Sequence, residues 1–200
     1  MRTSSETIRI GELELALVRP DEPESLLDED AFAEDEFMPY WAELWPAGLA
    51  LAHELPARLD RTRVVELGCG LGVPSLVAAA RGADVTAVDW AADAIALLHE
   101  NAARNGLDVA AVHADWRRFE GTFDLALAAD VVYEARNVEP LVRLLSETAP
   151  RALVGLAGRP YERDFLDRIG RFARVREQRR VARIRFDDPQ HRERARTARH

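Results

Sequence analysis

Residues 64–89 read VVELGCGLGVPSLVAAARGADVTAVD, and their pattern is the strongest indication of the fold in this sequence. Its first four residues predict a short buried strand that ends at a run of alternate glycines, Gly68, Gly70 and Gly72. Apolar residues continue with helical spacing through residues 71–80, and residues 84–89 predict a second strand. A strand, a helix and a further strand in this order are typical of a parallel β-sheet with helices packed on it.

The same alternation of strands and helices continues toward the C-terminus. Further strands are predicted at residues 109–113, 123–129 and 152–157, with a final pair within 172–186. Helices are predicted at residues 91–105, 137–148 and 161–170, as well as at 49–55 before the first strand. We therefore predict a Rossmann-like α/β fold, with a seven-stranded, mostly parallel sheet, helices on both faces and an antiparallel final strand.

Composition divides the chain into three predicted parts. Residues 1–37 combine a small hairpin at 7–17, which alternates around Gly11, with an acidic segment at 21–36. Residues 38–186 form the α/β domain, and residues 187–200 form a polar tail. The C-terminal part from Arg151 is rich in arginine, so the chain has either two solvated faces of opposite charge or an acidic rim that attracts a basic substrate.

Several classes of protein are disfavoured by the bulk properties. The net charge of −8 argues against general nucleic-acid binding, and no apolar run approaches the ~20 residues of a membrane span. The N-terminal residues lack the apolar core of a signal peptide, so we expect a cytoplasmic protein without a membrane partner. A single cysteine excludes an internal disulfide, and the histidines lack the spacing of a metal site, so no metal is expected.

The glycine spacing indicates the kind of cofactor. A dinucleotide fingerprint requires G-x-G-x-x-G, whereas this loop has G-x-G-x-G, with Val73 where the third glycine of that fingerprint belongs. A pyrophosphate needs backbone amides at a helix N-terminus. S-adenosylmethionine (SAM) has no phosphate and needs only room for the backbone to lie against it, which glycine provides. The loop therefore favours SAM over a nicotinamide dinucleotide.

Polar residues stand where the predicted strands end, at the edge of the sheet where ligands bind in such folds. Glu66 can meet the amino group of the methionine part, and Asp89 can accept the ribose hydroxyls or begin a helix. Asp115 can accept the adenine amino group, and Trp116 either covers the adenine or packs in the core. Asp130 interrupts an apolar strand and needs a partner, for which we expect a cationic group of the substrate or cofactor.

Together these residues resemble a known family, the seven-strand protein lysine methyltransferases, whose bacterial relatives are often described as predicted nicotinamide N-methylases. The resemblance covers roughly residues 38–165. It rests on Glu66-Leu67-Gly68-Cys69-Gly70, Asp89, Asp115-Trp116, Asp130-x-x-Tyr133, the Trp41-x-x-x-Trp45-Pro46-x-Gly48 stretch and Gly158-Arg159-Pro160. The acidic N-terminal segment and the arginine-rich C-terminus match nothing in this family.

The resemblance implies roles for individual positions. It places eight residues around SAM: Trp45, Glu66, Gly68, Gly70, Asp89, Asp115, Trp116 and Ala129. Asp130 and Tyr133 are implied to face the methyl acceptor. We expect them to orient an amine there and to ease the loss of its proton, with assistance from Glu43.

The sequence therefore predicts a SAM-dependent N-methyltransferase that acts on a lysine side chain of a protein. A small amine, such as a nicotinamide-like compound, is an alternative acceptor. A non-catalytic SAM-binding module and a nicotinamide-dependent oxidoreductase are alternatives of other classes. The polar pair Asp130 and Tyr133 argues against the first of these, and the glycine spacing argues against the second.

Overall fold

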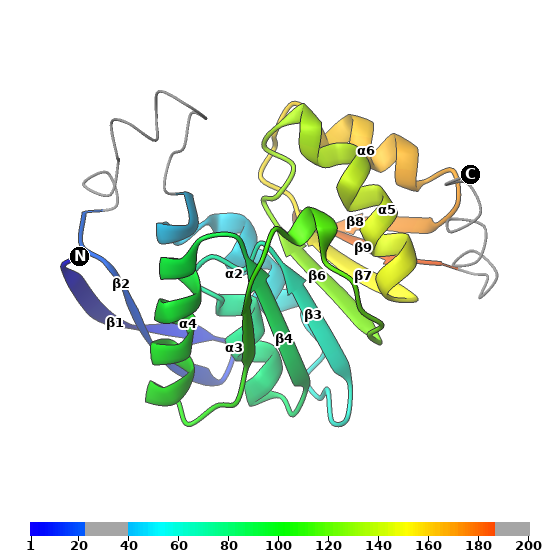
Figure 1. Ribbon diagram of the computed structural model, residues 1–200. Coiled ribbons are helices and arrows are strands. Elements are labelled where there is room, and N and C mark those ends of the chain that lie inside the picture. The colour runs from blue at the N-terminus through cyan, green and yellow to red at the C-terminus, as the bar shows by residue number, and fades with distance from the viewer. Residues whose placement is uncertain (23–39, 187–200) are drawn as a thin grey trace.

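The computed structural model describes residues 1–22 and 40–186 and is built around one seven-stranded sheet (Figure 1). Across the sheet the strands are β5 (Ala110–His113), β4 (Asp84–Asp89), β3 (Arg63–Leu67), β6 (Leu125–Ala129), β7 (Arg151–Gly155), β9 (Val181–Arg185) and β8 (Arg174–Gln178). The first five strands are parallel, and β9 runs antiparallel to both of its neighbours. The predicted fold class is confirmed.

The strand order places a crevice between β3 and β6. From β3 the chain proceeds outward to β4 and β5, and it then returns to the other side of β3 with β6 and β7. Ligands of open α/β sheets bind where the strand order reverses, beyond the carboxyl ends of the strands. The glycine loop after β3 and Asp130 after β6 both lie at this point.

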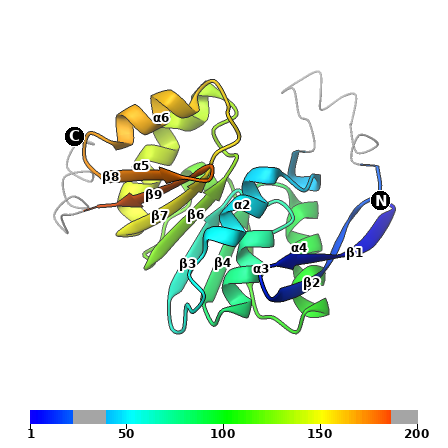
Figure 2. The same cartoon turned by 180° about the vertical axis from the view of Figure 1, so that it is seen from behind.

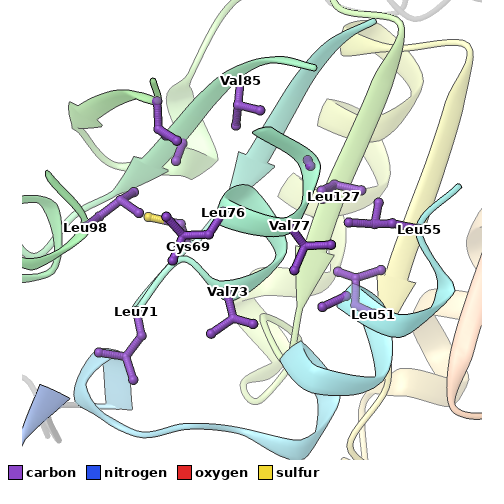
Figure 3. Close-up of a cluster of buried hydrophobic side chains, with 14 of the residues drawn as sticks. Leu51, Leu55, Cys69, Leu71, Val73, Leu76, Val77, Val85, Leu98 and Leu127 are labelled. Atoms are coloured by element: carbon purple, nitrogen blue, oxygen red, sulfur yellow. The ribbon is translucent and has the colours of Figure 1, made fainter. Parts of the chain in front are cut away.

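Helices cover both faces of the sheet, and each face has its own hydrophobic cluster. The first face carries α2 (Pro46–Glu54), α3 (Val73–Ala80) and α4 (Ala92–Arg104), and the second carries α5 (Val138–Thr148) and α6 (Glu162–Ile169). Figure 3 shows side chains of the first cluster, in which Leu51, Leu76, Val77 and Leu127 lie between the helices and the strands. Throughout residues 1–22 and 40–186, each helix is too short or too polar to cross a bilayer.

The N-terminal hairpin is longer than predicted and packs against α4 (Figures 1 and 2). Its strands are β1 (Thr3–Ile10) and β2 (Leu13–Pro20), whereas the alternation in the sequence predicted only residues 7–17. The side-chain amide of Asn101 donates to the Val18 carbonyl at 3.1 Å and accepts from the Val18 N–H at 2.7 Å. Asn105 binds Ala16 in the same way, so two amides fix the edge strand to the helix. Most of the acidic segment 21–36 and all of the tail 187–200 lie outside the described residues.

Candidate functional site

The glycine loop after β3 is a tight bend that only glycine accommodates at its key positions. Gly72 has a φ of +72°, and a Cβ there would lie 2.3 Å from Leu98 Cδ1. This left-handed residue ends the loop, so α3 begins at Val73 rather than at the predicted Leu71. Gly70 also has a positive φ, and a Cβ there would lie 3.0 Å from the Trp41 carbonyl oxygen. The segment that begins at Tyr40 therefore lies directly over the loop.

Asp89 at the end of β4 holds the glycine loop in place. Its Oδ2 accepts a hydrogen bond from the Gly70 N–H at 2.8 Å, and its Oδ1 accepts one from the Ala91 N–H at 2.9 Å. The residue is 3% exposed, and burial raises the pKa of the carboxyl while the backbone N–H groups act in the opposite direction. One carboxylate thus connects β4, the loop after β3 and the segment that leads into α4.

Glu66 has a partner within the chain that the sequence did not predict. Its carboxylate accepts hydrogen bonds from both the backbone N–H and the hydroxyl of Ser75 in the first turns of α3. Glu66 is 1% exposed, and burial raises its pKa to about 8, although the hydrogen bonds from Ser75 favour the charged form. Glu66 is also among the residues that line the pocket, so it lies between α3 and the space where a cofactor would lie.

Glu66→Gln is expected to reduce the loss of stability as the pH rises from about 5 to 8. The folded-state pKa of about 8 lies above the usual 4.5, so the folded chain retains a proton that the unfolded chain releases in this window. Stability from this group is complete below pH 4.5 and is lost as the pH rises toward 8. Between about pH 5 and pH 8 we expect the free energy of unfolding to fall by roughly 2–4 kcal/mol more in the wild type than in the variant. Urea unfolding at both pH values measures this difference. Equal losses in the two proteins would show that Glu66 ionises normally.

The two residues predicted to bind adenine both follow β5, but only one of them lines the pocket. Trp116 is buried in the second hydrophobic cluster and also lines the pocket. Asp115 does not line the pocket, because its carboxylate accepts from the backbone N–H of Arg117 and from its guanidinium, at 2.9–3.1 Å. Burial disfavours the charged form of Asp115, but the hydrogen bonds from Arg117 outweigh it and lower the pKa. An adenine amino group would have to share this carboxylate with Arg117.

Asp130 after β6 is paired within the chain, which corrects the expectation that its partner is a substrate or cofactor cation. The two carboxylate oxygens accept from Nε and Nη2 of Arg159 at 2.8 and 2.7 Å, and the Asp130 side chain is 4% exposed. Asp130 has a φ of +52°, which turns the chain sharply at the end of the strand. Arg159 comes from the Gly158-Arg159-Pro160 motif after β7, and its guanidinium lies 5.4 Å from the centre of the Trp45 ring.

Aromatic rings form the wall beside this ion pair. The ring of Tyr133 lies 5.3 Å from that of Tyr40, which in turn lies 6.1 Å from Trp45. The Trp45 indole N–H donates to the Tyr40 carbonyl at 2.7 Å, and Pro46 then starts α2. Burial raises the pKa of Tyr133, so its hydroxyl stays protonated at neutral pH. The wall offers π-faces, which attract cations.

A single pocket at the carboxyl ends of the strands brings the predicted residues together, with the exception of Asp115. Its lining includes Trp45, Glu66, Gly68, Gly70, Asp89, Trp116, Ala129, Asp130 and Tyr133. Glu43 also lines it. Tyr40, Trp90 and Arg159 line the pocket without a predicted role. The position of Trp90, directly after the strand-ending Asp89, was the one available signal for that residue.

Comparison with known families shows which proteins the central part of this sheet resembles. Residues 64–152 match a family model described as a methyltransferase domain. Residues 64–152 are similar to a methyltransferase domain. The matched residues begin at β3 and end at the start of β7, so this domain includes the glycine loop, Asp89 and Asp130.

Individual proteins agree with this assignment. The chain is 31% identical over 152 residues to the protein-lysine methyltransferase METTL21E of Bos taurus, a match that covers 65% of this chain and 52% of that protein. It is 32% identical over 132 residues to the electron transfer flavoprotein beta subunit lysine methyltransferase of Mus musculus, covering 61% and 52% of the two chains. The resemblance to protein lysine methyltransferases is confirmed. The chain spans about half the length of these two relatives.

A solved structure with bound AdoMet shares the fold of this chain. A 16S rRNA N2 G1207 methyltransferase of T. thermophilus, in complex with AdoMet and guanosine, superimposes with a TM-score of 0.67 over 93% of this chain and 51% of that chain. The two sequences are only 18% identical, so this similarity concerns the fold alone.

Proposed function

We propose that this chain is a SAM-dependent N-methyltransferase and that its methyl acceptor is a lysine side chain of a cytoplasmic protein. The observation that carries the proposal is the pocket itself. It combines a glycine loop held by Asp89 with an acceptor side formed by Asp130, Tyr133 and aromatic rings. The relatives that match most of this domain are named as lysine methyltransferases, which supports this choice of acceptor.

The residues of the pocket fit SAM. A Cβ at Gly68 would lie 2.9 Å from Val131 Cγ1 and 3.5 Å from the Trp116 indole nitrogen, so the loop leaves room only for bare backbone. We propose that Asp89 accepts the ribose hydroxyls and that Glu66 faces the methionine amino group. Gly68, Gly70, Trp116 and Ala129 are proposed to line the adenosine, Trp45 to cover it, and Asp115 to reach it by sharing its contacts with Arg117. When bound, SAM supplies an electrophilic methyl group on a sulfonium.

The acceptor side of the pocket is suited to an amine that must lose a proton. A lysine ammonium has a reference pKa of ~10.4 and is a nucleophile only after deprotonation. The rings of Tyr40, Tyr133 and Trp45 can attract the cation, and the carboxylate of Asp130 can accept its hydrogen bond. We propose that Asp130 and Tyr133 orient the amine for in-line attack, and that Arg159 is a positioning residue that holds the Asp130 carboxylate.

Arg159→Ala is expected to destabilise the protein and to impair turnover. The substitution leaves the Asp130 carboxylate buried without its bidentate partner, at a cost of about 3 kcal/mol. For a chain of this size the loss corresponds to a fall in Tm of roughly 6–10 °C. Calorimetric melting measures it, with Arg163→Ala as the control, because that arginine pairs with Asp167 on the exposed side of α6. An equal fall in both variants would contradict a specific role for the Asp130–Arg159 pair.

A small amine is the second candidate acceptor, and the aromatic wall is the observation that favours it. Tyr40, Tyr133 and Trp45 present flat surfaces on which a planar heterocycle can stack. The carboxylates of Glu43 and Asp130 line the same pocket and favour a cationic acceptor instead. The acidic residues between Asp28 and Asp35, which the sequence suggests as a rim for a protein substrate, lie outside the described residues.

The cofactor part of the proposal is tested by isothermal titration calorimetry with SAM, S-adenosylhomocysteine and NAD. We expect SAM and S-adenosylhomocysteine to bind and NAD to show no saturable binding, because the loop lacks the spacing for a pyrophosphate. Binding of NAD without binding of SAM would contradict the proposed function and favour an oxidoreductase. Binding of SAM without any transfer to proteins or small amines would favour a non-catalytic module.

A further inference from the structure

A second cavity, of about 320 Å³, lies at the amino ends of the parallel strands, on the opposite edge of the sheet from the candidate active site. It is bordered by the start of β6 and β7, by β8 and β9, and by the loop that follows α2. The figures show α2 on one side of β9 and α5 and α6 on the other (Figures 1 and 2). The helix α2 ends at Glu54, which pairs with Arg183 of β9.

Arginines on three adjacent strands line this cavity, and the sheet register places them opposite one another. The set, called here the arginine face, consists of Arg151, Arg174, Arg176, Arg183 and Arg185. Arg185 of β9 pairs across the sheet with Arg151 of β7 on one side and Arg174 of β8 on the other. Arg183 in the next row lies between Leu153 and Arg176. Alternate residues of a strand point to the same face, so all five guanidinium groups leave the sheet on one side.

Within the described residues, the charges of the arginine face are compensated only in part. Like charges placed directly opposite each other in neighbouring strands destabilise a sheet. Among the described residues that line the cavity there is no Asp or Glu. Glu54 at the end of α2 pairs with Arg183, but within residues 1–22 and 40–186 no carboxylate forms an ion pair with Arg151, Arg176 or Arg185. An anion in the cavity would relieve the repulsion that the sheet register imposes.

The floor of the cavity is apolar, so we expect a bound anion to carry a part that packs against apolar side chains. Leu59, Leu125 and Leu153 line it, and each is less than 10% exposed and belongs to the first hydrophobic cluster. Neighbouring strands lie ~4.8 Å apart, and alternate residues along a strand ~6.7 Å apart, so the five arginines surround a compact group rather than a long chain. A cavity of this volume suits a small ligand, and the net charge of −8 disfavours a nucleic acid.

We propose that the arginine face binds a nucleoside di- or triphosphate, with the phosphates on the guanidinium groups and the base against the leucine floor. Guanidinium groups bind phosphate oxygens in a bidentate manner, and Arg151, Arg176 and Arg185 together can serve two or more phosphates. This site is separate from the candidate active site and does not depend on the proposed methyl transfer.

The test measures binding of GTP and of inorganic tripolyphosphate by calorimetry at low ionic strength. Neither probe contains adenosine, so binding at the SAM pocket does not contribute. We expect GTP to bind more tightly than tripolyphosphate, because only GTP contacts the apolar floor. The double variant Arg151→Gln/Arg185→Gln is expected to weaken GTP binding by about tenfold or more. The control Arg9→Gln/Arg104→Gln removes the same charge from the hairpin and from α4, and its Kd should stay within about twofold of the wild type.

Thermal melting of the same variants separates loss of binding from loss of folding. We expect Arg151→Gln/Arg185→Gln to melt at or above the wild-type Tm without ligand, because the substitutions remove repulsion. Equal affinity for tripolyphosphate and GTP would overturn the nucleotide assignment. Absence of GTP binding at millimolar concentration, GTP binding that the double variant leaves unchanged, or binding only of a single-stranded oligonucleotide would overturn the proposed site.

Discussion

Asp130→Asn is expected to lower the rate of methyl transfer at saturating SAM by about a hundredfold or more, while the Kd for SAM changes by less than about threefold. The substitution keeps the shape of the side chain but removes the charge that attracts and orients the acceptor amine. Asp130 ends β6 on the acceptor side of the pocket, where Tyr133 and the aromatic wall also lie. Steady-state kinetics and calorimetry with SAM measure the two effects separately.

Asp124→Asn provides the matched control for this experiment. Asp124 comes directly before the same strand, also pairs with an arginine, Arg63, and does not line the pocket. It should retain the wild-type rate. A wild-type rate in Asp130→Asn would remove Asp130 from the acceptor site, and equal loss of SAM binding and rate would move its role to the cofactor.

Asp89→Ala is expected to weaken SAM binding by about tenfold to a hundredfold, the effect of removing a hydrogen bond to a charged group. The variant loses the proposed contact with the ribose and also releases the N–H groups of Gly70 and Ala91. We therefore expect the free energy of unfolding to fall as well, by about 2 kcal/mol. Calorimetry with SAM and with S-adenosylhomocysteine should show the same loss, because both share the adenosine.

Asp93→Ala is the control, because Asp93 is an exposed acid in the first turn of α4 and does not line the pocket. Its SAM affinity should match that of the wild type. Unchanged affinity in Asp89→Ala, with the folded state verified by circular dichroism, would remove Asp89 from the cofactor site.

Most of the fold followed from hydrophobic periodicity. The strand at residues 84–89 was predicted with its observed bounds, and the helix predicted at 137–148 begins one residue later, at Val138. The largest error was the hairpin, where residues 3–6 are exposed and polar and show no apolar alternation. Those residues are strand because they pair with β2, which α4 holds through Asn101 and Asn105. Such a tertiary contact leaves no local pattern in the sequence.

The position of the candidate site could be predicted from the ends of the strands. The partners of its charged side chains could not be predicted in this way. Asp130 and Arg159 are 29 residues apart and meet because β6 and β7 are neighbours in the sheet. Glu66 meets Ser75 only because the glycine loop reverses the chain into α3. The arginine face depends likewise on the register of β7, β9 and β8, although the sequence already showed the richness of the C-terminal part in arginine.

The most direct test of the central claim is transfer of labelled methyl from SAM into the proteins of a host lysate that lacks this gene. The chain contains no lysine, so the enzyme itself cannot produce a methyl-lysine band. We predict a discrete labelled protein with the wild type, containing methyl-lysine after hydrolysis, and no such band with Asp130→Asn. Label that appears only in the small-molecule filtrate, or a protein band of equal intensity with Asp130→Asn, would contradict the account.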